Sequence, residues 1–535
     1  MAPSSNIFSL LALLSLLIIP SLSLSKTPCE LHGSCDPEPD CTTSQLDTFA
    51  TTLKTTLSEI QKALSLLSKF TEFIPNFRQR TAIQDCVDLL DLSSDELTWT
   101  LSQTPNSGVS RPVFPATGRR KNDVATWLSA ALGNQDTCLD GFEGTDGVVK
   151  ELILGSLVQV TGLVGEILGM VKQIATVPLG KPLSGAGKQL ATEGRRLMGG
   201  FPSWFPSKDR RLLQIPVGGV AVNATVAADG TGNYTTVTDA ITAAPDHSEQ
   251  RYVIYVKKGV YNENVEVKKK KTNIMLLGDG KDVTVITGNR NFVDGWTTFR
   301  SATFAVSGNG FIARGITFEN SAGPEKHQAV AARVDSDLSA FYQCSFKGFQ
   351  DTLYAHSLRQ FYRDCDIFGT VDFIFGNAAA IFQNCRILPR KPLPNQKNSI
   401  TAHGRKDPNQ ITGFSIQFCN ISGDPELFPT KNSTETYLGR PWKQYSRTVI
   451  MQSYMSDVIH PQGWLAWQGD FALDTLYYGE YMNYGPGAGL GGRVKWPGYR
   501  AMGSVEATNF TVSQFIDGGL WLPATGVKFT AGLSF

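Results

Sequence analysis

Two aspartates at equivalent positions of a repeated pattern are the strongest candidates for chemistry in this 535-residue sequence. Asp351 follows Cys344 by seven residues, and Asp372 follows Cys365 by the same interval. If the pattern reflects stacked repeats, both carboxyl groups occupy the same station on successive repeats. At about 5 Å apart, one should keep a proton near neutral pH while the other is anionic. A protonated and an anionic carboxyl group in one site suit acid–base chemistry.

Two glutamines add amide donors to this arrangement. Gln350 directly precedes Asp351, and Gln328 lies close to one period earlier, so both amides can flank the carboxyl pair on neighbouring repeats. An aspartate in a turn more often caps that turn, but two in register beside glutamines favour catalysis. No histidine stands in a Gly-x-Ser-x-Gly context, and His327 and His356 are interpreted as structural. Apart from the cysteine series, no cluster of His, Cys, Asp or Glu has the spacing of metal ligands, so we expect no metal and no cofactor.

The repeated pattern itself predicts the fold. Four similar apolar segments each contain a cysteine; they are 341–346, 361–367, 381–387 and 416–421. The first three cysteines recur with a period of roughly 20 residues, the fourth follows after a longer interval, and a period of this length indicates stacked repeats. A parallel β-helix explains this repetition. The alternative, a β-sandwich, predicts no repetition of segments in register. We therefore expect an all-β domain of short strands separated by Gly, Asn and Asp turns.

Stacking also brings cysteines together. Adjacent coils lie about 4.8 Å apart, so Cys365 and Cys385 stand close enough for a disulfide bond. Cys344 is a rival partner for Cys365, and Cys419 is either one of a pair or a free thiol.

The N-terminal part has a helical texture. Apolar residues recur at steps of three and four between about 42 and 180, which predicts a four-helix antiparallel bundle. Cys86 and Cys138 fall on two of the helical segments, where one bridge can pin neighbours. The segment 152–177 is apolar enough to raise a membrane question, but Glu166 and Lys172 interrupt it, so a bundle helix is the preferred interpretation.

Targeting features indicate export. An apolar run at 7–19, followed by small residues, predicts a signal peptide at 1–25. Five glycosylation sequons agree with a secreted protein: Asn223, Asn233, Asn420, Asn432 and Asn509. The division we predict is a bundle at 26–180, a linker at 181–213 and a β-helix domain at 214–535. The linker holds Arg195-Arg196-Leu197 and Arg210-Arg211-Leu212, which suit a processing protease.

Charge excludes one class of partner. The sequence has 49 Lys and Arg against 48 Asp and Glu, and this balance argues against binding to nucleic acid through phosphate neutralisation. We also expect no membrane contact after signal cleavage and a monomeric mature protein.

Five ordered blocks resemble the plant pectin methylesterases, over about residues 214–530. They are Gly259-Val260-Tyr261-Asn262-Glu263, Gln328-Ala329-Val330, Gln350-Asp351-Thr352-Leu353, Asp372-Phe373-Ile374-Phe375-Gly376 and Leu438-Gly439-Arg440-Pro441-Trp442. The N-terminal part resembles the family's pro-region, which is related to pectin methylesterase inhibitors. The resemblance implies a right-handed parallel β-helix that demethylesterifies homogalacturonan in the plant cell wall. It also implies a bundle that inhibits or chaperones the enzyme, and a separate inhibitor protein as a further partner.

The resemblance assigns roles to the matching residues. Asp372 would be the nucleophile that forms an acyl-enzyme, and Asp351 would protonate the departing methanol and then activate water. Gln350 and Gln328 would stabilise the oxyanion. Arg440 would orient Asp372 and keep it anionic.

Sugar rings stack on aromatic side chains, which suggests further substrate contacts. Similarity to family substrate positions and aromatic character select Thr298, Phe299, Phe375, Trp442 and Trp464. The lysine run 268–271 is interpreted as a solvated turn rather than a polyuronate track.

Two other functions compete with this interpretation. A glycoside hydrolase of the polygalacturonase kind would also use paired carboxylates, but the amide pair and the Arg-Pro-Trp block favour ester chemistry. An inhibitor-like binding protein with an inert β-helix is disfavoured, because every candidate catalytic residue is present.

Overall fold

The computed structural model describes residues 39–70, 74–104, 107, 116–145, 148–174 and 221–534. The predicted signal peptide and the linker at 181–213 lie outside these residues. Residues 1–48 and 49–535 form two compact units. The second unit contains almost all of the described helices and every described strand, and it holds the candidate site.

Four described helices make up the N-terminal region, as the amphipathic pattern predicts; they are α2 (Pro39–Phe70), α3 (Phe77–Ser102), α4 (Arg120–Asp140) and α5 (Val148–Ile174). Asn76 caps α3, because its side chain accepts a hydrogen bond from the backbone N–H of Gln79. The predicted disulfide Cys86–Cys138 is confirmed and joins α3 to α4.

Helix α5 contains the apolar segment that raised the membrane question. Among the described helices, its stretch Val149–Val171 is long and apolar enough to cross a bilayer by length and composition. Leu157, Val160 and Val164 are nonetheless fully or almost fully buried, at steps of three and four residues. This one-sided burial is the pattern of a bundle helix.

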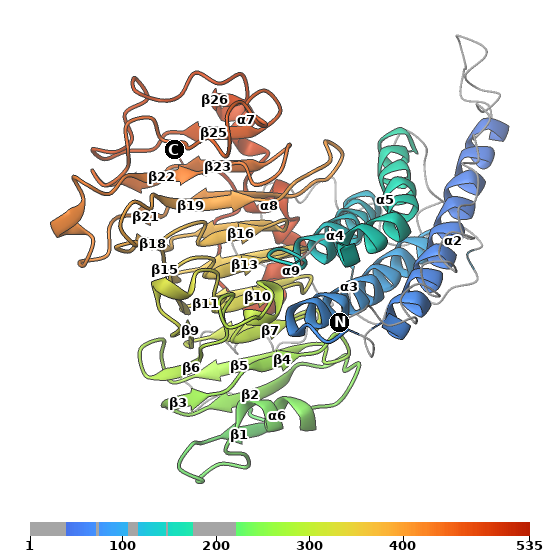
Figure 1. Cartoon of the computed structure of the whole chain (residues 1–535), viewed down its shortest axis with the longest axis horizontal. Coiled ribbons are helices and arrows are strands. Elements are labelled where there is room, and N and C mark those ends of the chain that lie inside the picture. Colours follow the sequence, from blue (N-terminus) through green and yellow to red (C-terminus); the bar gives the residue numbers. More distant parts are fainter. Residues whose placement is uncertain are drawn as a thin grey trace, which may run out of the picture. The chain divides into compact units, whose positions relative to one another are not determined.

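The C-terminal region is a parallel β-helix of three sheets (Figure 1). Sheet A consists of β1 (Ala224–Val226), β2 (Tyr252–Val256), β5 (Ile274–Gly278), β8 (Ile312–Arg314), β11 (Ser339–Tyr342), β14 (Arg359–Arg363), β17 (Ala379–Gln383), β20 (Gly413–Gln417), β23 (Arg447–Met451), β25 (Tyr477–Tyr481) and β26 (Tyr499–Ala501). Sheet B consists of β3 (Gly259–Asn262), β6 (Thr284–Gly288), β9 (Thr317–Asn320), β12 (Ser345–Lys347), β15 (Asp366–Gly369), β18 (Arg386–Pro389), β21 (Asn420–Ile421) and β24 (Tyr454–Met455). Sheet C consists of β4 (Val265–Val267), β7 (Phe304–Val306), β10 (Ala332–Val334), β13 (Leu353–Ala355), β16 (Ile374–Gly376), β19 (Asn398–His403) and β22 (Thr436–Gly439).

The coil register follows the spacing read from the sequence. Phe341 pairs with Tyr362, and Tyr362 pairs with Phe382, so each coil repeats the interval between successive cysteines. Their rings stack inside the coil with centroids 5.0 and 4.7 Å apart. Equivalent aromatic positions therefore form a continuous apolar column that holds successive coils in one register.

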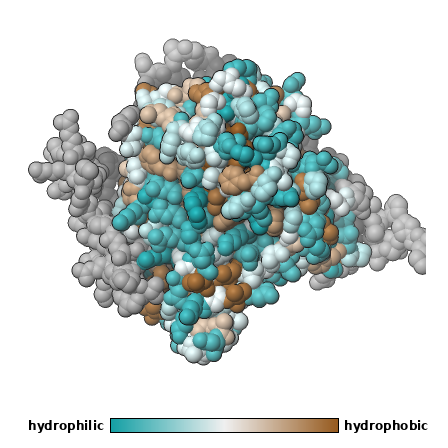
Figure 2. All heavy atoms as spheres, turned by 90° about the vertical axis from the view of Figure 1, so that its left-hand side faces the viewer, coloured by the Kyte–Doolittle hydropathy of each residue, from teal (hydrophilic) through white to brown (hydrophobic). Residues whose placement is uncertain are grey.

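Short helices complete the β-helix domain: α6 (Val237–Ala243), α7 (Ser504–Thr508), α8 (Val512–Phe515) and α9 (Gly518–Thr525). Val512, Ile516 and Trp521 from the last segment form one apolar cluster with Phe361 and Ile381 of sheet A. Figure 2 faces the side that carries β15, β18 and β21, where hydrophilic residues prevail and hydrophobic patches are separate.

The cysteine series stacks as predicted, but the disulfide Cys365–Cys385 is not formed. Both are buried free thiols, as are Cys344 and Cys419. The Cys365 thiol donates to the carbonyl of Phe341 on the preceding coil, and Cys385 and Cys419 repeat this contact one coil further each time. Because the coils are equivalent, each of these thiols donates a hydrogen bond to a backbone carbonyl and does not bond to one neighbouring cysteine.

Candidate active site

The two candidate aspartates occupy the same backbone position on successive coils. Asp351 precedes β13 with φ of 61°, and Asp372 precedes β16 with φ of 52°. Asp is one of the few non-glycine residues that adopts this left-handed conformation readily. Leu353 pairs with Ile374, each two positions after one of the aspartates, so the register predicted from the sequence is confirmed.

A cavity of about 240 Å³ opens where these turns meet sheet C; we call it the catalytic cavity. Nine of the predicted site residues line it: Thr298, Phe299, Gln328, Gln350, Asp351, Asp372, Phe375, Arg440 and Trp442. These residues come from five separate parts of the β-helix domain, and the coil stacking brings them together.

Arg440 distinguishes the two carboxyl groups electrostatically. Its Nε and Nη2 atoms donate to both carboxylate oxygens of Asp372, at 2.8 and 2.7 Å. Such bidentate, charge-assisted contacts hold a carboxylate in one orientation. Asp351 has no such partner among the described residues, and burial, together with the nearby charge of Asp372, raises its pKa well above the usual value. The site therefore combines an ion-paired carboxylate with a carboxyl group that retains its proton.

Aromatic rings form one wall of the catalytic cavity. Tyr354 stacks on Phe375 with ring centroids 4.1 Å apart, and Trp442 lies edge-on to both. Trp467 also lines the cavity, and the Arg440 guanidinium lies 4.4 Å from its ring centroid. Flat apolar faces of this kind suit the C–H surface of a sugar ring.

The prediction that Trp464 binds substrate is wrong, and Trp467 lines the cavity instead. Trp464 is 1% exposed and stacks on Tyr478 at 4.1 Å. A bridge between Gly439 and Trp464 extends sheet C, which turns the Trp464 side chain into the coil. Three residues later the chain has left this strand-like stretch, so Trp467 faces the cavity.

Residues of the bundle also line the catalytic cavity, and no sequence pattern pointed to them. They are Thr137, Asp140, Gly141 and Glu143. Thr137 bonds to His356 at 2.9 Å, and Lys443 donates to both oxygens of Asp140 at 2.9 and 3.0 Å. Burial lowers the pKa of His356 to about 3, so this ring is neutral and structural, as predicted.

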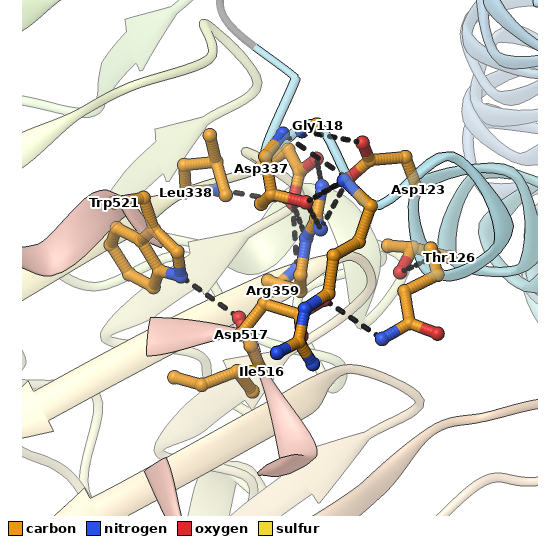
Figure 3. Close-up of polar contacts among 12 residues, drawn as sticks. Gly118, Asp123, Thr126, Asp337, Leu338, Arg359, Ile516, Asp517 and Trp521 are labelled. Atoms are coloured by element: carbon orange, nitrogen blue, oxygen red, sulfur yellow. Dashed lines mark hydrogen bonds and ion pairs between the residues drawn. The ribbon is translucent and has the colours of Figure 1, made fainter. Parts of the chain in front are cut away.

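A second set of contacts fixes α4 at the far end of β13. Arg359 donates to both oxygens of Asp337 at 3.0 and 2.7 Å, and to Asp123 of α4 at 2.6 Å (Figure 3). All three side chains are buried. Asp517 accepts hydrogen bonds from Arg119 and Asn122 nearby. The bundle therefore contacts the β-helix at both ends of the strand that carries the site.

Comparison with known proteins gives the family of the chain. A family model described as pectinesterase matches residues 223–519. The chain belongs to the pectinesterase family. A second model, described as plant invertase/pectin methylesterase inhibitor, matches residues 24–170. The chain is thus a pectin methylesterase, a carboxylic ester hydrolase, with an inhibitor-like N-terminal domain.

Relatives are similar over most of the pectinesterase chain. A pectinesterase/pectinesterase inhibitor of Prunus persica is 60% identical over 93% of this chain and 91% of its own length. Pectinesterase 1 of Citrus sinensis is 48% identical over 92% of this chain and 84% of its own. The solved pectin methylesterase from carrot is 58% identical, with a TM-score of 0.58, and covers 59% of this chain and 99% of that one.

Proposed function

We propose that Asp372 attacks the methyl-ester carbonyl at C6 of a galacturonate unit in homogalacturonan. The carboxylate oxygen bonds to the ester carbon, and methoxide leaves as methanol with the proton held by Asp351. Water then gives a proton to Asp351 as its oxygen bonds to the acyl carbon, and the bond between that carbon and the Asp372 oxygen breaks. Asp372 is restored as a carboxylate, and the galacturonic acid formed releases its remaining proton to solvent. The observation that carries this assignment is the bidentate Arg440–Asp372 pair beside a carboxyl group whose pKa is raised.

Gln350 and Gln328 supply the amide donors for the oxyanion in this proposal. Both line the catalytic cavity beside the two carboxyl groups. Each donor of this kind stabilises the transition state by about 2.7–4 kcal/mol. Thr298, Phe299, Phe375, Trp442 and the newly found Trp467 hold the sugar chain.

We propose further that the bundle masks this site within the same chain. Thr137, Asp140 and Glu143 occupy one side of the catalytic cavity. Lys406 pairs with Asp136 at 2.6 Å and Lys443 pairs with Asp140, which holds the end of α4 in place. Reversing the acidic charges at both ends of α4, by Asp123→Lys, Asp136→Lys and Asp140→Lys, should release the bundle, because Asp123 pairs with Arg359. We call this triple variant of the full chain the opened chain.

Methanol release on methylated pectin tests both parts. The opened chain should exceed the unmodified full chain by about tenfold or more in specific activity, and equal activities would refute masking. Asp372→Asn in the opened chain should lower kcat by roughly 10⁴-fold, the scale of losing a nucleophile. If Asp372→Asn retained nearly full activity, the assignment of the nucleophile would be wrong.

The site of action follows from the substrate. The five predicted glycosylation sites, Asn223, Asn233, Asn420, Asn432 and Asn509, are exposed in the structure. This exposure supports secretion to the cell wall, where pectin is found. Cleavage at an Arg-Arg-Leu site would free the β-helix domain as a monomer, and a separate inhibitor protein would bind where the bundle lies.

A further inference from the structure

An acidic stripe on α3 faces the β-helix. Its four aspartates recur at steps of three and four residues and so share one helix face: Asp85, Asp88, Asp91 and Asp95. All of them are paired with two cations of the β-helix. Arg300 bonds to Asp85 at 2.6 Å and also to Asp88, and Lys269 bonds to Asp91 and Asp95 at 2.7 and 2.8 Å.

The cations belong to a second cavity of about 870 Å³ between α3 and the β-helix. Its β-helix side carries five cationic side chains, Lys268, Lys269, Lys270, Arg300 and Arg333, and two carboxylates, Glu266 and Asp335. Phe299 lines both this cavity and the catalytic cavity. The basic surface is therefore continuous with the site of ester cleavage.

Three of these cations lie on successive coils. Arg333 is on β10, Arg300 precedes β7, and Lys269 follows β4, and these strands are consecutive neighbours in sheet C. Neighbouring strands are about 4.8 Å apart. The cations therefore form a staggered line along the second cavity, with one cation on each of three adjacent coils. Arg333 is level with Ala305 and Glu266 in the strand register, so Arg300 lies before that level and Lys269 beyond it.

Arg333 shows that the line is built for more than the bundle contact. Its side chain is 3% exposed and lies 3.3 Å from the ring centroid of Phe299. Its Nε and Nη1 atoms make no hydrogen bond within the described part of the chain, and the carboxylate of Asp335 is 4.0 Å from Nε. Leaving buried donors of a charged group unpaired is costly. A surface that served only to bind α3 would pair these donors with acceptors on α3. Instead, a cavity remains between α3 and Arg333.

We infer that Arg333, Arg300 and Lys269 form a track for the free carboxylates of partly demethylated pectin, and that the acidic stripe of α3 occupies this track as a substrate mimic. The inference rests on the proposed function, since it concerns the chain that enters the catalytic cavity. Methyl esters are uncharged and product galacturonate units are anionic, so the track favours a substrate with free carboxylates on one side of the scissile ester. For Lys269, this replaces the solvated-turn interpretation.

The test uses the opened chain, so that α3 leaves the track. Its selectivity is the kcat/KM for partly demethylated pectin divided by that for fully methylated pectin. Arg300→Gln and, separately, Lys269→Gln should each lower this ratio by about tenfold, equivalent to about 1.4 kcal/mol. Lys269 is partly exposed, so its variant remains informative if Arg300→Gln does not fold. Lys347→Gln, which removes one charge from sheet B instead, should leave the ratio unchanged.

Binding of a galacturonate decamer, measured by titration calorimetry, tests the mimicry. The opened chain should bind the decamer about tenfold more tightly than the unmodified full chain, and Arg300→Gln should weaken its binding. Equal affinity of both chains would overturn the mimicry. Methanol release with an unchanged selectivity ratio in both variants would overturn the track. Absence of methanol from either pectin would instead count against the proposed catalytic function.

Discussion

At the scale of single residues, two tryptophans three positions apart have opposite environments. Trp464 is buried against Tyr478, and its indole N–H bonds to Glu480 at 3.3 Å. Trp467 lies half-buried in the catalytic cavity beside Arg440. One side chain therefore packs inside the coil, and the other is the one that we propose to contact the substrate.

Alanine at each position should separate these roles. Trp464→Ala should lower the free energy of unfolding by about 3–5 kcal/mol, since it empties a buried site. Trp467→Ala should leave stability within about 1 kcal/mol and raise KM for methylated pectin several-fold. Urea unfolding and methanol-release kinetics on the opened chain measure the two effects. A large stability loss at Trp467 with KM unaltered would contradict its placement in the cavity.

The grouping of the candidate catalytic residues in one cavity could be predicted, because each stands in a short motif whose position depends on the coil period. Asp351 and Asp372 could be found from that period alone, together with the glutamine that adjoins Asp351. The error at Trp464 arose because aromatic type alone does not say which face of a strand a side chain occupies. Thr137 and Glu143 could not be found, since their role depends on docking between distant parts of the chain.

At the scale of elements, the sequence predicts repeats well and pairings poorly. The period of the apolar segments was enough for the β-helix, and the three- and four-residue steps were enough for the bundle helices. The disulfide Cys365–Cys385 failed because four stacked thiols are equivalent, so spacing cannot select a pair. Cys86 and Cys138 have no such competitors on α3 and α4, and there the bridge formed.

The Cys86–Cys138 bridge should stabilise the bundle. It closes a loop with a sequence separation of 52 residues, and a disulfide of this kind typically contributes about 2–4 kcal/mol. The double variant Cys86→Ala/Cys138→Ala should therefore show faster amide hydrogen exchange throughout α3 and α4. Exchange in sheet A serves as the internal control and should not change. Unaltered exchange in both helices would mean that packing alone fixes the bundle.

At the scale of the whole molecule, contact between the bundle and the β-helix buries carboxyl groups. Burial raises the pKa of Asp85 to about 6, although Arg300 and Thr297 oppose this shift. Burial also raises the pKa of Asp136 and of Asp335. In a released bundle, an exposed aspartate would return toward its ordinary pKa of about 3.9. Between about pH 4 and 6, Asp85 therefore keeps a proton in the docked form and loses it in the released form.

This difference makes masking depend on pH. For Asp85 the raised pKa belongs to the docked state, so docking strengthens as pH falls from about 6 to about 4 and is unaffected by this group above about 6. The gain is at most about tenfold per pH unit for each such carboxyl group. The activity of the full chain divided by that of the opened chain should thus rise as pH increases from about 4 to about 6 and then level off. Taking the ratio removes the pH dependence of catalysis itself. Asp85→Asn in both chains should flatten the rise, because asparagine has no proton to exchange, and a ratio that rises toward acid pH would contradict the sign of this linkage.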